Sequence, residues 1–266
     1  MMVRAGTLAA YALASIACTG QGAGPAPAPT PGDAATSGDT TVSGPRADAA
    51  PVPSSAPPEP TSAALEVPRA RAPFWPTGHF RIQIWANAAN THTLLDAQGK
   101  GAVPMNEARF LWDDAHLYVF FYGGDLDLES RTTKHDGPVW TDDSIALIFP
   151  QPDGSQRVIQ IGITGVVADG VCPADAAALS DARCDLKWES GVRAATDADG
   201  TLNKIGDNDE EWAIEAAIPL AAIGVAAPAA GRRVPFAVRR CDMQHDGPHE
   251  CGAWGERPPG VLLLER

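Results

Sequence analysis

Alternating hydrophobic and polar positions predict a series of short β-strands in this chain. The clearest case is a hairpin, in which two apolar segments, 108–112 and 117–122, flank the polar loop 113–116. An unbroken apolar run at 143–149 predicts a strand that is buried on both faces. The other predicted strands are 80–85, 157–163, 186–195, 211–218, 234–239 and 261–265.

These strands predict an all-β fold. They are separated by Gly-, Pro- and Asp-containing turns, and the only helical pattern is a single turn near 220–223. Regular short strands without long amphipathic helices are typical of a β-sandwich or barrel. We therefore expect residues 73–266 to form one all-β domain, a sandwich or barrel, with about nine or more mostly antiparallel strands.

The N-terminal residues have the pattern of a secretory signal. A positively charged start is followed by small and apolar residues at 5–17, a run too short to span a bilayer as a mature helix. The stretch 14–18 resembles a bacterial lipobox, which predicts removal of residues 1–17 and lipidation of Cys18. Simple secretory cleavage near Ala17 is the alternative, because Ser15 stands where a lipobox usually has Leu.

Residues 18–72 are predicted to be a disordered tether. From residue 19 this segment holds 11 of the chain's 24 prolines and no aromatic residue, so it cannot bury enough apolar area to offset its ordering entropy. Proline stiffens it, which suits a spacer between an anchor and a domain. Thr19, in place of Asp, favours sorting to the outer membrane. We therefore expect an exported outer-membrane lipoprotein, periplasmic or surface-exposed, that contacts the membrane through its lipid anchor only.

Charge limits the classes of partner. From residue 73 onward the chain carries 16 basic and 28 acidic residues. An acidic body of this kind repels phosphate backbones, so we expect no nucleic-acid partner.

Four cysteines remain when Cys18 is set aside, and an even number is expected to pair in an oxidising compartment. Three pairings are available. Proximity in sequence favours Cys172 with Cys184 and Cys241 with Cys251. Each bond would close a short loop and stabilise the fold by roughly 2–3 kcal/mol.

A zinc site is the alternative for the second pair. Cys241, His245, His249 and Cys251 offer a Cys2His2 ligand set, although their spacing matches no common zinc finger. Because exported thiols tend to oxidise, the disulfide is the favoured interpretation.

Trp140 has an unusual setting. All seven tryptophans lie beyond residue 72, and Trp140 directly precedes a turn with Asp142 and Asp143. An indole beside carboxylates suits stacking on a sugar ring, whose faces are apolar and whose rim is hydroxylated. Packing in the core is the alternative, since most tryptophans are largely buried.

Several segments occur in an order that carries a resemblance. They are the Trp-Asp and Leu-Tyr-Val hairpin at 110–121, Asp125, the Trp-Thr-Asp-Asp-Ser stretch at 139–145, the Trp-x-x-Glu-x-x-Ile-Pro strand at 211–220, and Trp254. This order resembles the family 9 carbohydrate-binding modules, over nearly all of residues 80–266. The resemblance implies a β-sandwich of jelly-roll or DOMON-like type that binds carbohydrate.

The resemblance assigns a role to Trp140, which matches the family's first sugar-stacking tryptophan. Other positions depart from the family: Ala146 replaces a sugar-binding Glu, and Gln160 stands near the place of a basic residue. The loop that carries the second stacking tryptophan is shortened here to 255–260, and Trp254 matches a core residue of the strand before it.

The predicted function is non-catalytic binding of a mono-, oligo- or polysaccharide. Trp140 would stack on the sugar, while Asp142 or Asp143, and also Arg109, would bind its hydroxyls. Neighbours on a strand point to opposite faces, so the two aspartates cannot form a glycosidase pair. No nucleophile elbow, phosphate loop or dinucleotide motif occurs in the sequence, and we expect no enzymatic activity.

A structural calcium ion is a further hypothesis, and no other cofactor is required. Asp125, Asp127 and Glu129 alternate, which would place three carboxylates on one strand face, and related modules carry structural calcium. A solvated acidic edge is the alternative.

Haem is a second candidate ligand, because related DOMON-like domains bind it through Met with His or Lys. Met105, Met243 and several histidines are available, but the chain has no Cys-x-x-Cys-His motif for covalent attachment. A structural envelope protein without a small ligand is a third alternative.

Overall fold

The computed structural model describes residues 63–79, 81–101, 105–245 and 250–266. The predicted signal, Cys18 and most of the predicted tether lie outside these residues, as do Phe80 and His249. No helix in the described part of the chain is long and apolar enough to cross a membrane.

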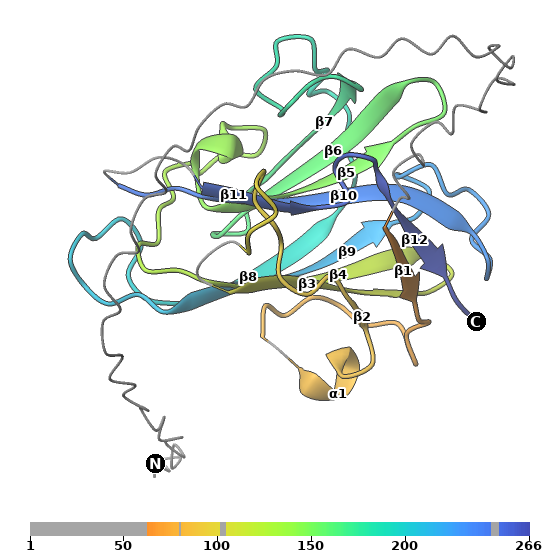
Figure 1. Ribbon diagram of the computed structural model, residues 1–266, viewed down its shortest axis with the longest axis horizontal. Helices are drawn as coiled ribbons and strands as arrows, with labels where there is room; N and C mark the ends of the chain where they lie inside the picture. Colours follow the sequence, from red (N-terminus) through yellow and green to blue (C-terminus); the bar gives the residue numbers. More distant parts are fainter. Residues whose placement is uncertain (1–62, 80, 102–104, 246–249) are drawn as a thin grey trace, which may run out of the picture. The chain divides into compact units, whose positions relative to one another are not determined.

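The described strands form two sheets (Figure 1). The larger sheet has the order β1-β12-β10-β5-β6-β7, with β11 also paired to β10. Its strands are β1 (Ala64–Val67), β5 (Ser144–Pro150), β6 (Ser155–Gly162), β7 (Val167–Pro173), β10 (Arg233–Asp242), β11 (Glu250–Trp254) and β12 (Gly260–Leu264). The smaller sheet has the order β2-β3-β4-β9-β8. Its strands are β2 (Ala89–Asn90), β3 (Asn106–Trp112), β4 (His116–Gly124), β8 (Arg193–Asp199) and β9 (Glu211–Pro219).

The inner faces of the two sheets form the main core. On β4, Leu117, Val119 and Phe121 point into this core together with residues of β5, β6 and β10. Each such side chain contributes about 1.5–3 kcal/mol through burial. Every strand pair is antiparallel except β1 with β12, which is parallel. The predicted all-β sandwich is therefore confirmed.

Part of the outer face of the smaller sheet is also covered. Tyr118 and Phe120 point outward from β4 and pack against the segment 69–88. Phe74 stacks on Tyr118 with 4.2 Å between the ring centroids, and Trp85 has no exposed surface. This segment closes one end of the face and leaves the other end open.

Two predictions about the N-terminal part of the domain are wrong. β1 lies inside the predicted tether 18–72 and pairs with β12, so the folded part begins before residue 73. The segment 80–85, predicted as a strand, contains the short helix α1 (Ile82–Trp85). The helical turn brings the Trp85 indole to the buried Glu215 carboxylate, where Nε1 donates to Oε1 at 2.8 Å.

Other strand boundaries differ in ways that pairing explains. The predicted hairpin, 108–112 with 117–122, is confirmed as β3 and β4. The strand predicted at 186–195 begins only at Arg193, where pairing with β9 starts. The sequence pattern did not indicate β2, β7 or β11. β2 has only two residues, and β7 and β11 contain Gly, Cys or charged residues that obscure alternation.

Both predicted disulfides are present, Cys172–Cys184 and Cys241–Cys251. The second occupies a cross-strand pair of β10 and β11. The Cys2His2 zinc alternative is therefore wrong, because its two thiolates are used in this bond.

Candidate functional site

Trp140 lies in the short helix η1 (Val139–Thr141) that precedes β5. Its indole is half-buried and packs against the small apolar cluster around Val158 and Cys172. Beside it, on the outer face of the larger sheet, is a pocket of only about 70 Å³ that also includes Ala146, Gln160 and Arg239. Ala146 pairs directly with Gln160 on β6 and with Arg239 on β10. Three positions that the resemblance selected, 140, 146 and 160, therefore do meet.

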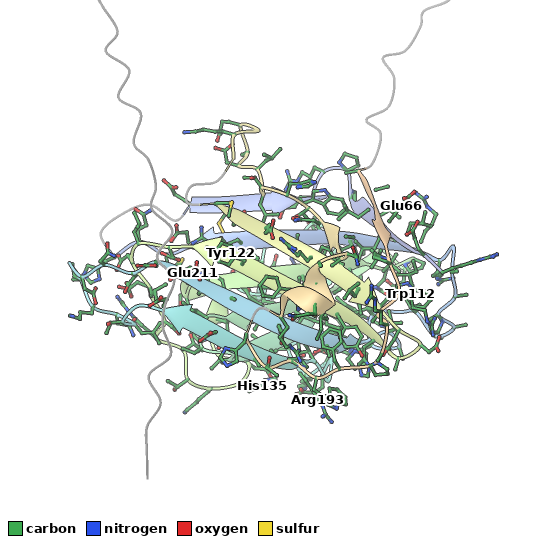
Figure 2. All side chains as sticks on the ribbon, turned by 90° about the horizontal axis from the view of Figure 1, so that it is seen from below. Glu66, Trp112, Tyr122, His135, Arg193 and Glu211 are labelled. Atoms are coloured by element: carbon green, nitrogen blue, oxygen red, sulfur yellow. A yellow bond between two sulfur atoms is a disulfide. The ribbon has the colours of Figure 1, made fainter. Side chains whose placement is uncertain are left out.

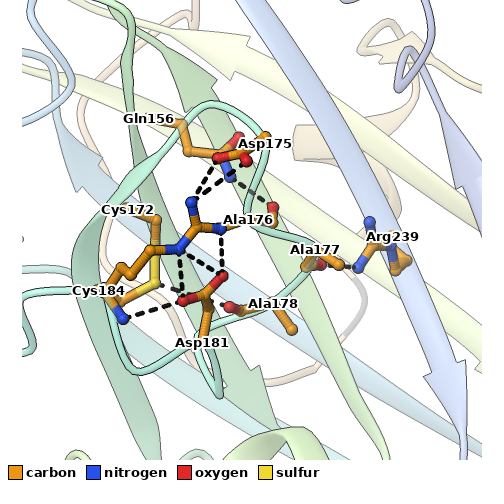
Figure 3. The surroundings of a disulfide bond; sticks show 10 residues. Gln156, Cys172, Asp175, Ala176, Ala177, Ala178, Asp181, Cys184 and Arg239 are labelled. Atoms are coloured by element: carbon orange, nitrogen blue, oxygen red, sulfur yellow. Dashed lines mark hydrogen bonds and ion pairs between the residues drawn. A yellow bond between two sulfur atoms is a disulfide. The ribbon is translucent and has the colours of Figure 1, made fainter.

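The loop after β7 fills most of the space in front of this pocket. Figure 3 shows the loop leaving Cys172, passing Ala177 and returning to Cys184, where the disulfide closes it. Arg239 Nη1 donates to the Ala177 carbonyl at 2.6 Å, which holds the loop against the sheet. Small-molecule pockets usually measure about 300–1,000 Å³, so the space beside Trp140 is too small for a sugar in this conformation.

Asp142 and Asp143 do not face the Trp140 ring. Both are buried, with 1% and 0% of their surfaces exposed. Asp142 accepts hydrogen bonds from the backbone N–H groups of Arg131 and Thr132, and Asp143 accepts from those of Glu129 and Met243. The expectation that one of them lines the sugar-binding surface is therefore wrong, because all four bonds hold neighbouring loops.

Asp143 belongs to a buried carboxylate cluster with Asp125 and Asp242, whose ligand-type oxygens lie within 4.8 Å of one another. The Arg240 guanidinium lies among them, 2.8 Å from Asp125 and 3.4 Å from Asp242. Burial raises the pKa of Asp143 to about 8, assisted by the charge of Asp125. Burial likewise raises the pKa of Asp242 to about 6, against the opposing effect of Arg240. The cluster thus contains its own cation, Arg240, and Asp143 retains its proton near neutral pH.

The predicted calcium ligands do not converge. Residues 125–129 form a loop and not a strand, so their alternation does not place them on one face. Asp125 accepts from Trp212 and Arg240, and Asp127 accepts from the His245 backbone N–H. Glu129 lies instead beside the His245 ring, with 3.0 Å between Oε1 and Nδ1. Each carboxylate has its own protein partner.

The two methionines proposed as haem ligands have different surroundings. Met105 is 61% exposed, whereas Met243 is buried and its backbone N–H binds Asp143.

A cavity of about 510 Å³ lies on the open end of the smaller sheet's outer face. We call it the β4 groove. Cross-strand pairing builds it in rows: Glu107 pairs with Tyr122, Tyr122 with Ala213, and Ala213 with Asp197. A neighbouring row places Glu211 opposite Asp199. Residues paired in this way stand about 5 Å apart on one face, which makes a continuous lining.

Tyr122 and Glu211 both line the groove and lie side by side (Figure 2). The Tyr122 hydroxyl donates a short hydrogen bond to the Glu211 carboxylate. Burial raises the pKa of Tyr122 to about 12, and the hydrogen bond and charge of Glu211 act in the same direction. The hydroxyl therefore remains protonated, and the half-buried Tyr122 side chain stays neutral among the acidic residues that line the groove.

Arg109, a predicted site residue, lies in this groove and not near Trp140. Its Nε donates to Glu107 Oε1 at 2.6 Å, so the cation and the carboxylate form an ion pair on this side of the groove. Across the groove are Asp197 and Asp199, both exposed. Four carboxylates against one guanidinium give the groove a negative potential.

The groove is hollow for two reasons. Ala213 of β9 has a small side chain. The aromatic residues of the covering segment 69–88 pack on Tyr118 and Phe120, and beyond them the segment reaches the edge of the groove through Gly78 and through the contact of His79 with Asp197. Glu215 is fully buried and accepts hydrogen bonds from Trp85 and from Thr77, whose N–H lies 2.7 Å from Oε2. Arg81 also contacts it at 3.0 Å. This buried carboxylate fixes the covering segment and so sets one end of the groove.

Sequence reasoning found Arg109 but missed the rest of the groove. A signal was present, because polar residues alternate with core residues on β3 and β9. Tyr122 likewise alternates with Phe121 on β4. What alternation cannot show is that β3, β4, β9 and β8 are neighbours, which depends on pairing between distant segments.

Comparison with protein-family models and with curated proteins finds no match. Solved structures with a similar fold include a candidate carbohydrate-binding protein from Bacteroides uniformis, with a TM-score of 0.57 and 12% identity over 77% of this chain and 100% of that one. Two structures of a family 9 carbohydrate-binding module from Caldicellulosiruptor kristjanssonii are also similar, each at 14% identity over 76% of this chain. The cellotriose complex has a TM-score of 0.52 over 93% of that chain, and the glucose complex 0.51 over 96%. Likeness at this identity shows a shared fold.

Proposed function

We propose that this protein binds carbohydrate without chemically changing it, and that the sugar occupies the β4 groove. The observation that carries the proposal is the groove itself: its volume of about 510 Å³ is within the usual range for small-molecule sites. The folds of the similar structures, two of which contain cellotriose or glucose, support the ligand class.

The groove has the chemistry that a sugar requires. The Tyr122 ring offers an apolar face for the C–H face of a pyranose. Glu107, Glu211 and Asp197 provide acceptors for sugar hydroxyls, and Arg109 provides a donor. Because the groove is open and carries one partly exposed aromatic ring, we expect micromolar to millimolar affinity.

Charge selects among glycans. Four carboxylates and one guanidinium line the groove, so a uronate or sulfated sugar is repelled. Neutral and amino sugars are not. We therefore expect neutral β-glucan oligosaccharides and chito-oligosaccharides to bind better than anionic glycans.

The Trp140 surface is the alternative location, and one observation favours it. Trp140, Ala146 and Gln160 meet in one pocket, as the family resemblance implied. Binding there requires the loop 174–183 to move away from Arg239. The free volume of the β4 groove is about 510 Å³, whereas that of the Trp140 pocket is about 70 Å³, which is why we assign the sugar to the groove.

The two locations can be separated by a matched pair of substitutions, Tyr122→Leu and Trp140→Leu. Calorimetric titration of the full chain with neutral oligosaccharides should show about tenfold weaker binding for Tyr122→Leu. That is the effect of losing an aromatic contact worth about 1.4 kcal/mol. Trp140→Leu should bind as the unaltered protein does. The opposite result would move the site to Trp140, and no binding of any neutral or amino glycan would overturn the proposed function.

We also propose that the domain is displayed on the envelope by a lipid on Cys18. The lipobox-like stretch and the proline-rich tether support this. Labelling with a radioactive or clickable fatty acid should mark the protein in the membrane fraction, and Cys18→Ala should abolish the label. Incorporation that persists in Cys18→Ala would contradict the anchor without affecting the proposal on sugar binding.

A further inference from the structure

A second cluster of polar side chains lies away from both sugar-site candidates. His135 Nε2 is 3.0 Å from Glu189 Oε2 and 3.6 Å from Asp136 Oδ2. Asp169 of β7 completes the group, since the ligand-type atoms of His135, Asp169 and Glu189 all lie within 4.8 Å of one another. His135 lies at the surface of the domain (Figure 2).

Asp169 is the unusual member, because it is buried and one of its oxygens has no partner. Only 1% of its surface is exposed. Oδ2 accepts hydrogen bonds from the backbone N–H and the hydroxyl of Ser190, whereas Oδ1 has no hydrogen-bond partner among the described residues. An unsatisfied buried carboxylate oxygen costs on the order of 1–3 kcal/mol or more, so such an atom calls for an explanation.

The buried cluster of Asp125, Asp143 and Asp242 differs in one respect. There Arg240 provides the positive charge, at 2.8 Å from Asp125. Around Asp169 the neighbouring groups are two carboxylates, Asp136 and Glu189, and the His135 imidazole. No Lys or Arg of the described residues forms an ion pair with any of these four residues. Arg240 thus balances the charge of the Asp125 cluster, whereas no basic side chain of the described residues balances the carboxylates around Asp169.

We propose that His135, Asp169 and Glu189 bind a divalent transition-metal ion such as Zn²⁺. Zn²⁺ takes imidazole and carboxylate ligands at about 2.0–2.2 Å in tetrahedral geometry, which places neighbouring ligand atoms about 3.4 Å apart. The distance of 3.0 Å from His135 to Glu189 is close to that value, and Asp169 offers an oxygen within 4.8 Å of the ligand atoms of both. An imidazole ligand disfavours Ca²⁺, which prefers six to eight oxygens.

Such an ion would join three separate segments of the chain. His135 and Asp136 belong to the loop that leads to η1 and Trp140, Asp169 to β7, and Glu189 to the loop before β8. Hydrogen bonds already hold these segments together, including Asp136 N–H to the Val167 carbonyl at 3.0 Å. Because the unfolded chain does not bring these residues together, the metal ion would bind the folded state and not the unfolded one, and so would raise the midpoint of thermal unfolding.

The test is a Zn²⁺ titration of the full chain carrying Cys18→Ser, because Cys18 is outside the two disulfides and a free thiol would itself bind zinc. Calorimetry should show one saturable site, and thermal unfolding should shift upward with added Zn²⁺. His135→Ala should weaken binding by tenfold or more, about 1.4 kcal/mol at the least, and remove the shift. Glu189→Gln should do the same. The His135 and Glu189 side chains are 49% and 63% exposed, so neither substitution should disturb the fold, and circular dichroism checks this.

His79→Ala is the matched control. His79 is also a surface histidine paired with a carboxylate, Asp197 at 2.9 Å, but it is not part of a three-residue ligand group within the described chain. It should leave the Zn²⁺ affinity and the thermal shift unchanged. Absence of a saturable site, or equal losses in His135→Ala and His79→Ala, would overturn the proposal.

Discussion

The two outer faces of the sandwich have been covered in different ways. On the larger sheet, a disulfide-closed loop rests on Ala146 and Gln160 and reduces the Trp140 pocket to about 70 Å³. On the smaller sheet, the segment 69–88 covers only one end, and a groove of about 510 Å³ remains at the other.

This difference shows why a family resemblance locates a fold better than a site. Trp140 has kept its place at the entrance of β5, yet the loop 174–183 occupies the space where a ligand would lie. Tyr122 is on a face that the resemblance did not mark, and it lines the open groove. A sandwich has two outer faces, and loops and covering segments decide which of them is accessible.

The largest expected effect comes from the residue that anchors the partial cover. Glu215→Ala removes a buried carboxylate and leaves the Arg81 and Trp85 donors without their acceptor. Removal of one member of a buried ion pair costs about 3–5 kcal/mol, and we expect a loss of that size in urea unfolding. Glu210→Ala, at an exposed position nearby in sequence, should change stability by less than about 0.5 kcal/mol. Similar losses in both variants would mean that Glu215 does not hold the cover in place.

The second effect concerns the opposite face. Replacing both Cys172 and Cys184 with Ser opens a bond that spans 12 residues, with an expected loss of about 2–4 kcal/mol. Freeing the loop should also expose Trp140, which acrylamide quenching of tryptophan fluorescence would detect. Glu210→Ala is the control, since this exposed residue lies in the connection between β8 and β9 and should leave quenching unchanged. Unchanged quenching in both variants would show that the loop covers Trp140 without the disulfide.

The third effect lies between the two sheets, in the carboxylate cluster. The pKa of Asp143 is about 8 in the folded protein and near 4 in the unfolded chain, so the folded state binds more protons between these values. Stability should therefore fall as pH rises from about 5 to 8, by more than the 1.4 kcal/mol that one pKa unit represents. The buried Asp242, with a pKa of about 6, contributes in the lower half of this range.

Asp143→Asn should flatten the dependence of stability on pH, because the Asn carboxamide does not titrate in this range. Urea unfolding at pH 5 and pH 8 measures it, with Asp114→Asn at an exposed position as the control. A slope that survives in Asp143→Asn would place the proton uptake elsewhere.

The smallest effect refines the ligand specificity of the β4 groove. Asp197→Asn together with Asp199→Asn removes two exposed charges from its rim. Each such charge is worth about 0.2–1 kcal/mol, so removing both should raise the affinity for an anionic sugar roughly two- to thirtyfold while a neutral sugar is little affected. Calorimetry at low and high salt would measure this, and the gain should shrink in high salt. Equal gains for neutral and anionic sugars would exclude charge as the cause.

Local pattern was sufficient for several features of this protein. Alternation identified the β3–β4 hairpin, because each residue of a half-buried strand reports its own face. Both disulfides followed from the number and spacing of the cysteines. Their spacing was informative because each pair closes a short loop.

Features that depend on distant pairing could not be predicted in the same way. β1 was assigned to the tether since four residues flanked by proline-rich sequence carry little signal until β12 pairs with them. Asp143 and Arg109 were both predicted to bind a ligand at Trp140. One is buried between the sheets and the other lies in the β4 groove.

The amino-acid sequence by itself determined the all-β class, the acidic charge, the cysteine pairs and which residues could contact a ligand. The tertiary structure alone decided which of those residues lie together and which face is open. The physical reason is that strand propensity and residue chemistry are local properties. A groove, by contrast, arises from the register of four strands and from the segment that leaves part of them uncovered.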